Sequence, residues 1–118
     1  MAIAIEELKA MGLEISKENP IYIDLPMYSG SETYKNRANA FKQSVEKSLA
    51  GVIIINLLDC PTAADWYNAA YYPDLGSQMN YDISDVSGWG PDWGDPNSYL
   101  DTMLPDYMGS MSKNLGIF

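Results

Sequence analysis

The sequence predicts an α/β fold with a three-stranded, mainly parallel sheet whose strands are joined by crossover helices. Short runs rich in β-branched, aromatic or aliphatic residues alternate with longer segments of helical periodicity, which is the pattern of a parallel sheet. One such run, residues 52–58, is apolar almost throughout, as in a strand covered on both faces. At 118 residues, 47% of them hydrophobic, the chain is long enough to form one small domain with a core.

Residues 1–20 predict a leading helix and a polar connector. Ile5, Leu8 and Met11 recur at helical spacing, which places them on one face. Gly12 fits the left-handed residue that ends such a helix.

Residues 21–25 alternate and predict the first strand, which Pro26 is expected to end. A long helix is predicted from about Glu32 to Leu49, because apolar residues recur along it at spacings of three and four. Ser29 and Glu32 resemble a capping box at its start. The basic residues of this helix lie largely off the apolar stripe and are interpreted as a solvated face; they are Lys35, Arg37, Lys42 and Lys47.

Gly51 fits the end of the long helix, and Val52 to Leu58 predict the second strand. Asn56 lies inside this apolar run and needs a hydrogen-bond partner. At an unprotected sheet edge the run would favour pairing with other chains, so dimers or higher species are expected.

Thr62 and Asp65 form a second candidate capping box, ahead of a helix predicted from about Ala63 to Tyr71. Trp66 is interpreted as a core residue of this helix. Residues 73–78 predict a turn.

Residues 81–86 alternate and predict the third strand. The hydrophobic pattern leaves the strand order open. If the first strand lies between the other two, a topological switch point falls between the first and third strands, and ligands of open α/β sheets bind there. A last short helix is predicted over 99–104, capped by Ser98 or Asn97, and residues 105–118 are expected to form a loosely ordered tail.

The charge of the chain is uneven. The net charge is −9, of which residues 51–118 carry −8. An acidic surface repels phosphates, so no nucleic-acid partner is expected, and cationic ligands are favoured. Cys60 is the single cysteine and there is no histidine, which excludes a disulfide framework and the usual zinc and Ser-His sites. No signal peptide and no apolar run of membrane-spanning length is recognised.

The stretch with the most distinctive chemistry is residues 87–100, S-G-W-G-P-D-W-G-D-P-N-S-Y-L. Gly88 and Gly90 leave the main chain uncovered beside the rigid Trp89 and the carboxylate of Asp92. Such a loop suits an extended, positively charged ligand. The alternative is a surface turn whose tryptophans fill the local core.

The motif at 88–100 resembles the signature loop of bacterial oligopeptide-binding proteins of ABC importers, a family of extracytoplasmic solute-binding proteins. The segments N-L-L-D at 56–59, P-T-A-A-D-W-Y-N-A at 61–69 and M-N-Y-D-I-S at 79–84 are similar too, so the resemblance covers roughly residues 20–115. Family members are several times longer than this chain. The resemblance therefore implies a fragment of one lobe of a two-lobed, periplasmic-binding-protein-like fold.

The resemblance also implies a peptide site. Main-chain groups of Gly88, Trp89 and Gly90 would pair with an extended peptide, Trp89 would wall the cleft, and Asp92 would bind the peptide α-ammonium. In the full-length protein it implies lobe closure over the peptide, delivery to a membrane permease, and an extracytoplasmic location with a lipoprotein anchor. Neither enzymatic activity nor a cofactor is expected.

Two other binding functions remain open for the same loop. A hard cation would be held by carboxylates and loop carbonyls, and a carbohydrate would stack on aromatic rings. The residues concerned are Asp92, Asp95 and Asp101 for calcium, and Trp89, Trp93 and Tyr99 for a sugar.

Overall fold

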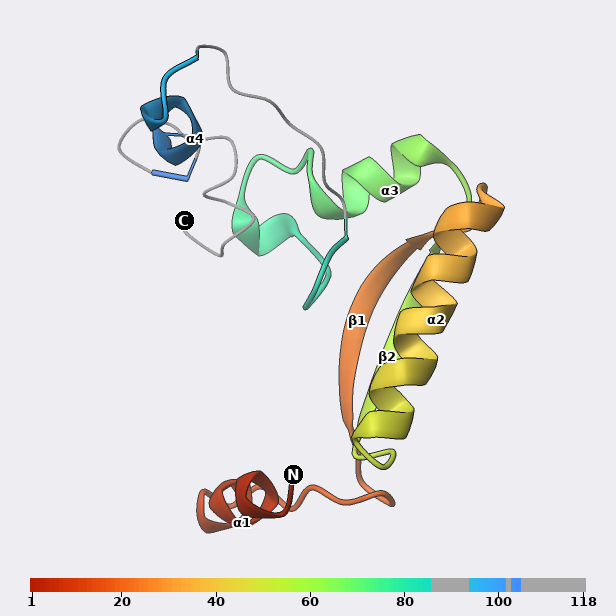
Figure 1. Ribbon diagram of the computed structural model, residues 1–118, viewed down its shortest axis with the longest axis vertical. Helices are drawn as coiled ribbons and strands as arrows, with labels where there is room; N and C mark the ends of the chain where they lie inside the picture. The colour runs from red at the N-terminus through yellow and green to blue at the C-terminus, as the bar shows by residue number, and fades with distance from the viewer. Residues whose placement is uncertain (86–93, 102, 105–118) are drawn as a thin grey trace.

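The computed structural model describes residues 1–85, 94–101 and 103–104 (Figure 1). Two strands, one long helix between them and four shorter helical segments make up this part of the chain. In chain order they are α1 (Ala2–Ala10), β1 (Ile21–Tyr28), α2 (Glu32–Ser48), β2 (Ile53–Cys60), α3 (Ala63–Ala70), the 3₁₀ turn η1 (Gly76–Gln78) and α4 (Asn97–Asp101). No helix in these ranges has both the length and the apolar character needed to cross a membrane.

The strands β1 and β2 form a parallel pair joined by α2. Ile21 lies opposite Ile53, and the register continues without interruption to Tyr28 opposite Cys60. The α/β class, the parallel pairing and the crossover helix are therefore confirmed.

Pro26 does not end the first strand, contrary to the sequence prediction, and the reason is its position in the ladder. The amides of Ile21 and Ser29 donate to the carbonyls of Val52 and Cys60 at 2.9 and 3.0 Å, so odd-numbered residues of β1 direct their main-chain groups toward β2. Pro26 is even-numbered, and its missing N–H would have faced the opposite edge. The proline therefore removes no bond from the pair.

The prediction of a third strand over 81–86 is wrong for the residues that the structure describes, because 81–85 are not a strand. The described sheet has two strands instead of three. The segment does reach the free edge of β1, where the amides of Asp82 and Ile83 both donate to the Asp24 carbonyl at 3.0 and 3.1 Å. However, the Asp24 amide donates to the side chain of Asp82, at 2.9 Å. A carboxylate thus replaces the main-chain acceptor that would continue a ladder.

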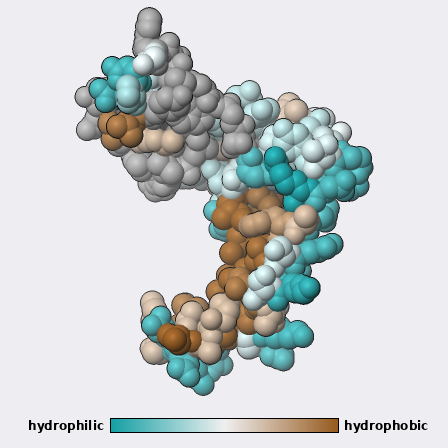
Figure 2. All heavy atoms as spheres, viewed as in Figure 1, coloured by the Kyte–Doolittle hydropathy of each residue, from teal (hydrophilic) through white to brown (hydrophobic). Residues whose placement is uncertain are grey.

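Helix α2 covers one face of the pair and forms the core with it. Leu25, Ala38 and Ile55 are 3%, 3% and 1% exposed. Burying a leucine or isoleucine side chain contributes about 1.5–3 kcal/mol, so this contact is the main apolar attachment of α2. Figure 2 shows hydrophobic side chains gathered over the strands and hydrophilic ones on the side of α2 that faces away from them.

The two predicted capping boxes differ in outcome. Helix α3 begins as predicted, with the Asp65 amide donating to Thr62 Oγ1 at 3.1 Å and the Thr62 amide to Asp65 Oδ2 at 3.2 Å. The box at Ser29 and Glu32 does not form, because the Ser29 amide still donates across the sheet at 3.0 Å. The residue before α2 is Ser31, whose side chain makes no capping bond.

The other helix ends follow the expected local chemistry. Gly12 takes the left-handed conformation that ends α1, with a φ of 87°. After α2 that conformation already begins at Ala50, with a φ of 55°, and continues at Gly51, with a φ of 75°. The last helix begins earlier than predicted, at Asn97, because Asp95 Oδ1 accepts a hydrogen bond from the Asn97 amide at 2.9 Å. The predicted tail, 105–118, lies outside the described residues.

Candidate functional site

The peptide-binding residues predicted from the sequence, Gly88, Trp89, Gly90 and Asp92, lie outside the described residues. The structure does describe the elements that lead up to them. These are the carboxyl ends of β1 and β2, the start of α2, helix α3 and the segment 81–85. These elements are called the framework of the candidate site.

Asp24 is the polar centre of the framework. Its carbonyl accepts the amides of Asp82 and Ile83, its amide donates to the Asp82 carboxylate, and its own Oδ1 accepts from Asn56 Nδ2 at 2.7 Å. Asn56 lies beside Asp24 in the register, so the partner that the sequence required for Asn56 is this carboxylate. Asp24 thus ties three chain segments together at the middle of the sheet.

The position of segment 81–85 fits the strand order considered from the sequence. Because Asp24 is even-numbered, its main-chain groups face away from β2, and the segment that binds them lies on the opposite edge of β1. β1 is therefore flanked by β2 on one side and by residues 82–83 on the other. Because residues 81–85 are not a strand, the described sheet does not contain the switch point considered from the sequence.

A second anchor holds the end of the same segment to α2. Arg37 Nη2 and Nε lie 2.7 and 3.0 Å from Asp85 Oδ2, and the Arg37 guanidinium lies 4.4 Å from the centroid of the Tyr34 ring. Asp85 is the last described residue before the gap at 86–93. The pair therefore sets where the chain leaves the sheet toward the predicted binding loop. The sequence alone indicated that Arg37 belongs to a solvated face. The structure shows instead that Arg37 binds Asp85.

An apolar hollow of about 430 Å³ lies between this segment and α2. Leu25, Ala38, Phe41 and Ile83 form its wall, and Phe41 is 44% exposed. Arg37, Ser84 and Asp85 also line it, and because Arg37 and Asp85 are paired with each other, the hollow is interpreted as a packing surface.

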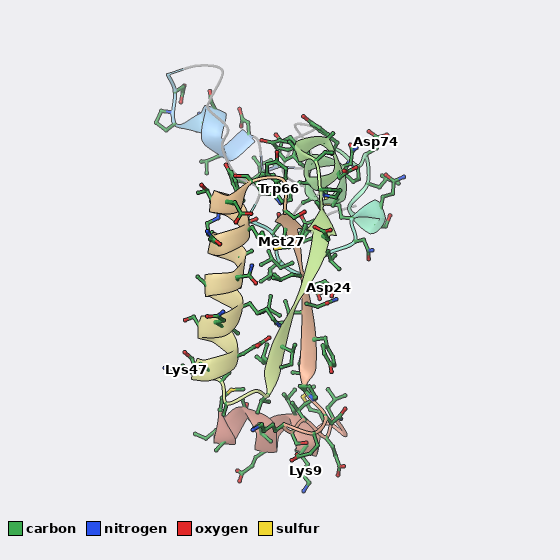
Figure 3. The ribbon with its side chains drawn as sticks, turned by 90° about the vertical axis from the view of Figure 1, so that its right-hand side faces the viewer. Lys9, Asp24, Met27, Lys47, Trp66 and Asp74 are labelled. Carbon is green, nitrogen blue, oxygen red and sulfur yellow. The ribbon has the colours of Figure 1, made fainter. Side chains whose placement is uncertain are left out.

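Aromatic side chains gather at the carboxyl ends of the strands. Trp66 stacks on Tyr28 with the ring centroids 5.9 Å apart, and it meets the Tyr34 ring edge-on at 5.1 Å. Trp66 is 4% exposed, so its interpretation as a core residue is confirmed. Figure 3 shows Asp24 midway along the strands, Met27 nearer their carboxyl ends and Trp66 beyond them. The contacts of Tyr28 and Tyr34 with Trp66 could not be predicted, because nothing local in the sequence pairs these residues.

The two turns at this end of the sheet are in close contact. A Cβ atom on Gly30 would clash with the Pro61 carbonyl oxygen and with the ring of Tyr28, so the turn after β1 requires glycine here. This contact fixes the turn between β1 and α2 against the turn between β2 and α3.

Cys60 ends β2 in this region. Burial raises the pKa of its thiol, and the negative charges of Asp59 and Asp65 raise it further. The thiol, which is 5% exposed, donates to the Leu58 carbonyl at 3.6 Å. A protonated, buried thiol is a poor nucleophile, and the described residues contain no group of three or more acidic or cysteine side chains suited to a metal ion.

No family model matches the chain. Individual curated proteins do. Oligopeptide-binding protein AmiA of Streptococcus pneumoniae is 34% identical over 102 residues, covering 86% of this chain and 15% of AmiA. Oligopeptide-binding protein AliA of the same species is 31% identical over 115 residues, covering 98% of this chain and 17% of AliA. Oligopeptide-binding protein SarA of Streptococcus gordonii is 33% identical over 88 residues, covering 75% of this chain and 13% of SarA.

A solved structure has the same fold over most of the chain. It is Haemophilus influenzae OppA in complex with RPPGFSPFR, with a TM-score of 0.65 and 20% identity over 93% of this chain and 19% of that chain. The chain spans 13% to 17% of the length of the three curated relatives. The resemblance seen in the sequence is therefore confirmed, and the chain is a homologue of one part of the bacterial oligopeptide-binding proteins.

Proposed function

We propose that this chain forms one wall of a cleft that binds extended oligopeptides, as part of the solute-binding component of an ABC peptide importer. The observation that carries the proposal is the similarity to AmiA, AliA and SarA, which are named as oligopeptide-binding proteins, over 75% to 98% of the chain. The structure of OppA, which contains the bound peptide RPPGFSPFR, agrees with this ligand class.

The contact with peptide is assigned to the loop that follows Asp85. Main-chain groups of Gly88, Trp89 and Gly90 pair with the peptide backbone like an added strand, which accepts mixed sequences because it reads no side chains. The carboxylate of Asp92 accepts hydrogen bonds from the peptide α-ammonium. Two features support this: the anchoring of residues 82–85 beside β1, and the net charge of −8 over residues 51–118.

The remainder of the mechanism belongs to the full-length protein. A second lobe closes over the peptide, and the loaded protein delivers it to a membrane permease. The protein works outside the cytoplasm, is held at the membrane by a lipid anchor, and carries out no chemistry on the peptide. Apolar side chains that the described chain leaves open, such as Tyr22 at 65% exposure, are covered by the rest of the lobe.

A titration followed by NMR tests the peptide site. The 118-residue chain is titrated with a pool of tri- to pentapeptides, and the Trp89 indole and the Gly88 and Gly90 amides are observed. We expect shifts at all three groups with free peptides. N-terminal acetylation should weaken binding by about tenfold or more, because it removes the charge that Asp92 binds.

Asp92→Asn should reproduce the effect of acetylation, whereas Asp101→Asn, the same change of charge on the exposed end of α4, should not. Equal binding of free and acetylated peptides would refute the role of Asp92 while leaving peptide binding intact. A response to calcium or to a sugar panel, with none to peptides, would overturn the proposal in favour of the other two ligand classes.

A further inference from the structure

The outer edge of β2 has main-chain groups that can be located from the register. Since even-numbered residues of β2 bond to β1, the odd-numbered residues Ile53, Ile55 and Leu57 direct their N–H and C=O groups away from the pair. An edge of this kind can accept another strand. Pairing with a strand of another chain is most favourable along the apolar run 52–58, which has a high β-propensity.

Two side chains of α2 occupy the middle of this edge. Lys42 Nζ donates to the Ile55 carbonyl at 2.7 Å, and Glu46 Oε1 accepts from the Ile55 amide at 3.3 Å. Lys42 and Glu46 also form an ion pair with each other, one helical turn apart. A neighbouring strand would supply the same groups at this point, namely one donor for the carbonyl and one acceptor for the amide.

The burial of the pair agrees with a fixed position. The Lys42 and Glu46 side chains are 31% and 26% exposed, whereas those of the Glu32–Lys35 pair on the same helix are 79% and 45% exposed. An ion pair that holds two long side chains in one geometry loses side-chain entropy. The bonds to Ile55 offset that loss and satisfy main-chain groups that would otherwise be open.

We propose that the Lys42–Glu46 pair acts as a substitute for a neighbouring strand and closes the outer edge of β2 to pairing with a second copy of this chain. The opposite edge of the sheet carries a related device, since the Asp82 carboxylate binds the Asp24 amide one register step away. This inference is independent of the peptide-binding proposal. It reduces the self-association expected from the sequence, because the main-chain groups of Ile55, in the run 52–58, are already hydrogen-bonded to Lys42 and Glu46.

The test compares two double variants with the same net charge. Lys42→Met with Glu46→Met removes both bonds to Ile55, while Glu32→Met with Lys35→Met removes the exposed pair and adds the same two apolar side chains to the same helix. Sedimentation velocity should show self-association of the first variant at concentrations at least about tenfold lower than for the second or for the wild type. Amide exchange at Ile55 should accelerate about tenfold in the first variant alone.

Two further variants separate edge pairing from misfolding. Glu46→Gln keeps an oxygen acceptor for the Ile55 amide and should behave as wild type. Adding Ile53→Pro to the Lys42→Met, Glu46→Met variant removes an outward donor without breaking the pair with β1, and should restore the monomer. The proposal is overturned if the two double variants associate equally, or if the proline increases association, since the variant then associates by unfolding.

Discussion

Arg37 on α2 and Asp85 at the end of the described segment 81–85 are bonded through two guanidinium nitrogens to one carboxylate oxygen, at 2.7 and 3.0 Å. The same guanidinium lies over the Tyr34 ring, which itself contacts Trp66. One arginine therefore connects the exit toward the predicted binding loop to the aromatic cluster at the carboxyl end of the sheet.

The Arg37–Asp85 pair should position its segment more than it stabilises the fold. The side chains are 50% and 33% exposed, so a double-mutant cycle with Arg37→Gln and Asp85→Asn should give a coupling below about 1 kcal/mol in urea unfolding, and less in high salt. Amide exchange at Ile83 should nevertheless accelerate in either single variant. The same cycle on Glu32 and Lys35 should leave Ile83 unchanged, and an equal effect there would contradict the positioning role.

Because Thr62 caps its helix and Ser31 does not, replacing each with alanine should lower the stability by different amounts. Thr62→Ala should lower the free energy of unfolding by about 1 kcal/mol, because the side chain accepts from the Asp65 amide at the start of α3. Ser31→Ala should cost only a few tenths of a kcal/mol, since Ser31 makes no side-chain cap. Urea unfolding of both variants measures the difference, and equal losses would show that the box at Thr62 does not stabilise the helix.

Trp66 should tolerate phenylalanine better than alanine. Trp66→Ala leaves a cavity beneath Tyr28 and Tyr34 and should cost about 3–5 kcal/mol. Trp66→Phe keeps an aromatic ring, and no hydrogen bond is lost because Trp66 Nε1 has no partner in the described part of the chain. Its loss should stay below about 2 kcal/mol. Urea unfolding with near-ultraviolet circular dichroism checks both values, and Leu75→Ala, at 52% exposure, is the surface control.

The raised pKa of Cys60 predicts a loss of stability in alkali. The folded protein holds the thiol proton more tightly than the unfolded chain does, so this contribution is complete below the ordinary thiol pKa of about 8.5 and is lost as pH rises through the higher folded pKa. The unfolding free energy of the wild type should therefore fall more steeply above about pH 8.5 than that of Cys60→Ala. Parallel curves for the two proteins would show that the thiol is not perturbed.

Local signals in the sequence predicted most of the elements. The helical stripe of α2, the apolar run of β2, the capping box at Thr62 and the left-handed Gly12 all depend on residues within one or two turns of each other. The local predictions that failed at Pro26 and Ser29 did so because of tertiary contacts. Pro26 is accommodated because its N–H position faces away from β2, and Ser29 stays in the sheet because Cys60 accepts its amide.

The candidate site also has a part that the sequence predicts and a part that depends on tertiary contacts. The sequence motif singled out residues 88–92, and the resemblance that it carries is confirmed by AmiA, AliA and SarA. The framework around the motif could not be predicted. Asp24 and Asp82 are 58 residues apart and Arg37 and Asp85 are 48 apart, and no periodicity links residues at such separations.

The sequence by itself determined the α/β class, the parallel pair with its crossover helix, and the relationship to oligopeptide-binding proteins, because these depend on local patterns and on a specific motif. Only the tertiary structure decided which edge of β1 receives residues 82–83, that a carboxylate replaces a ladder bond there, and that Lys42 and Glu46 bond to the main chain of Ile55. Those outcomes depend on where main-chain donors and acceptors are left after the strands pair. The register of the sheet decides this, and the register exists only in the folded chain.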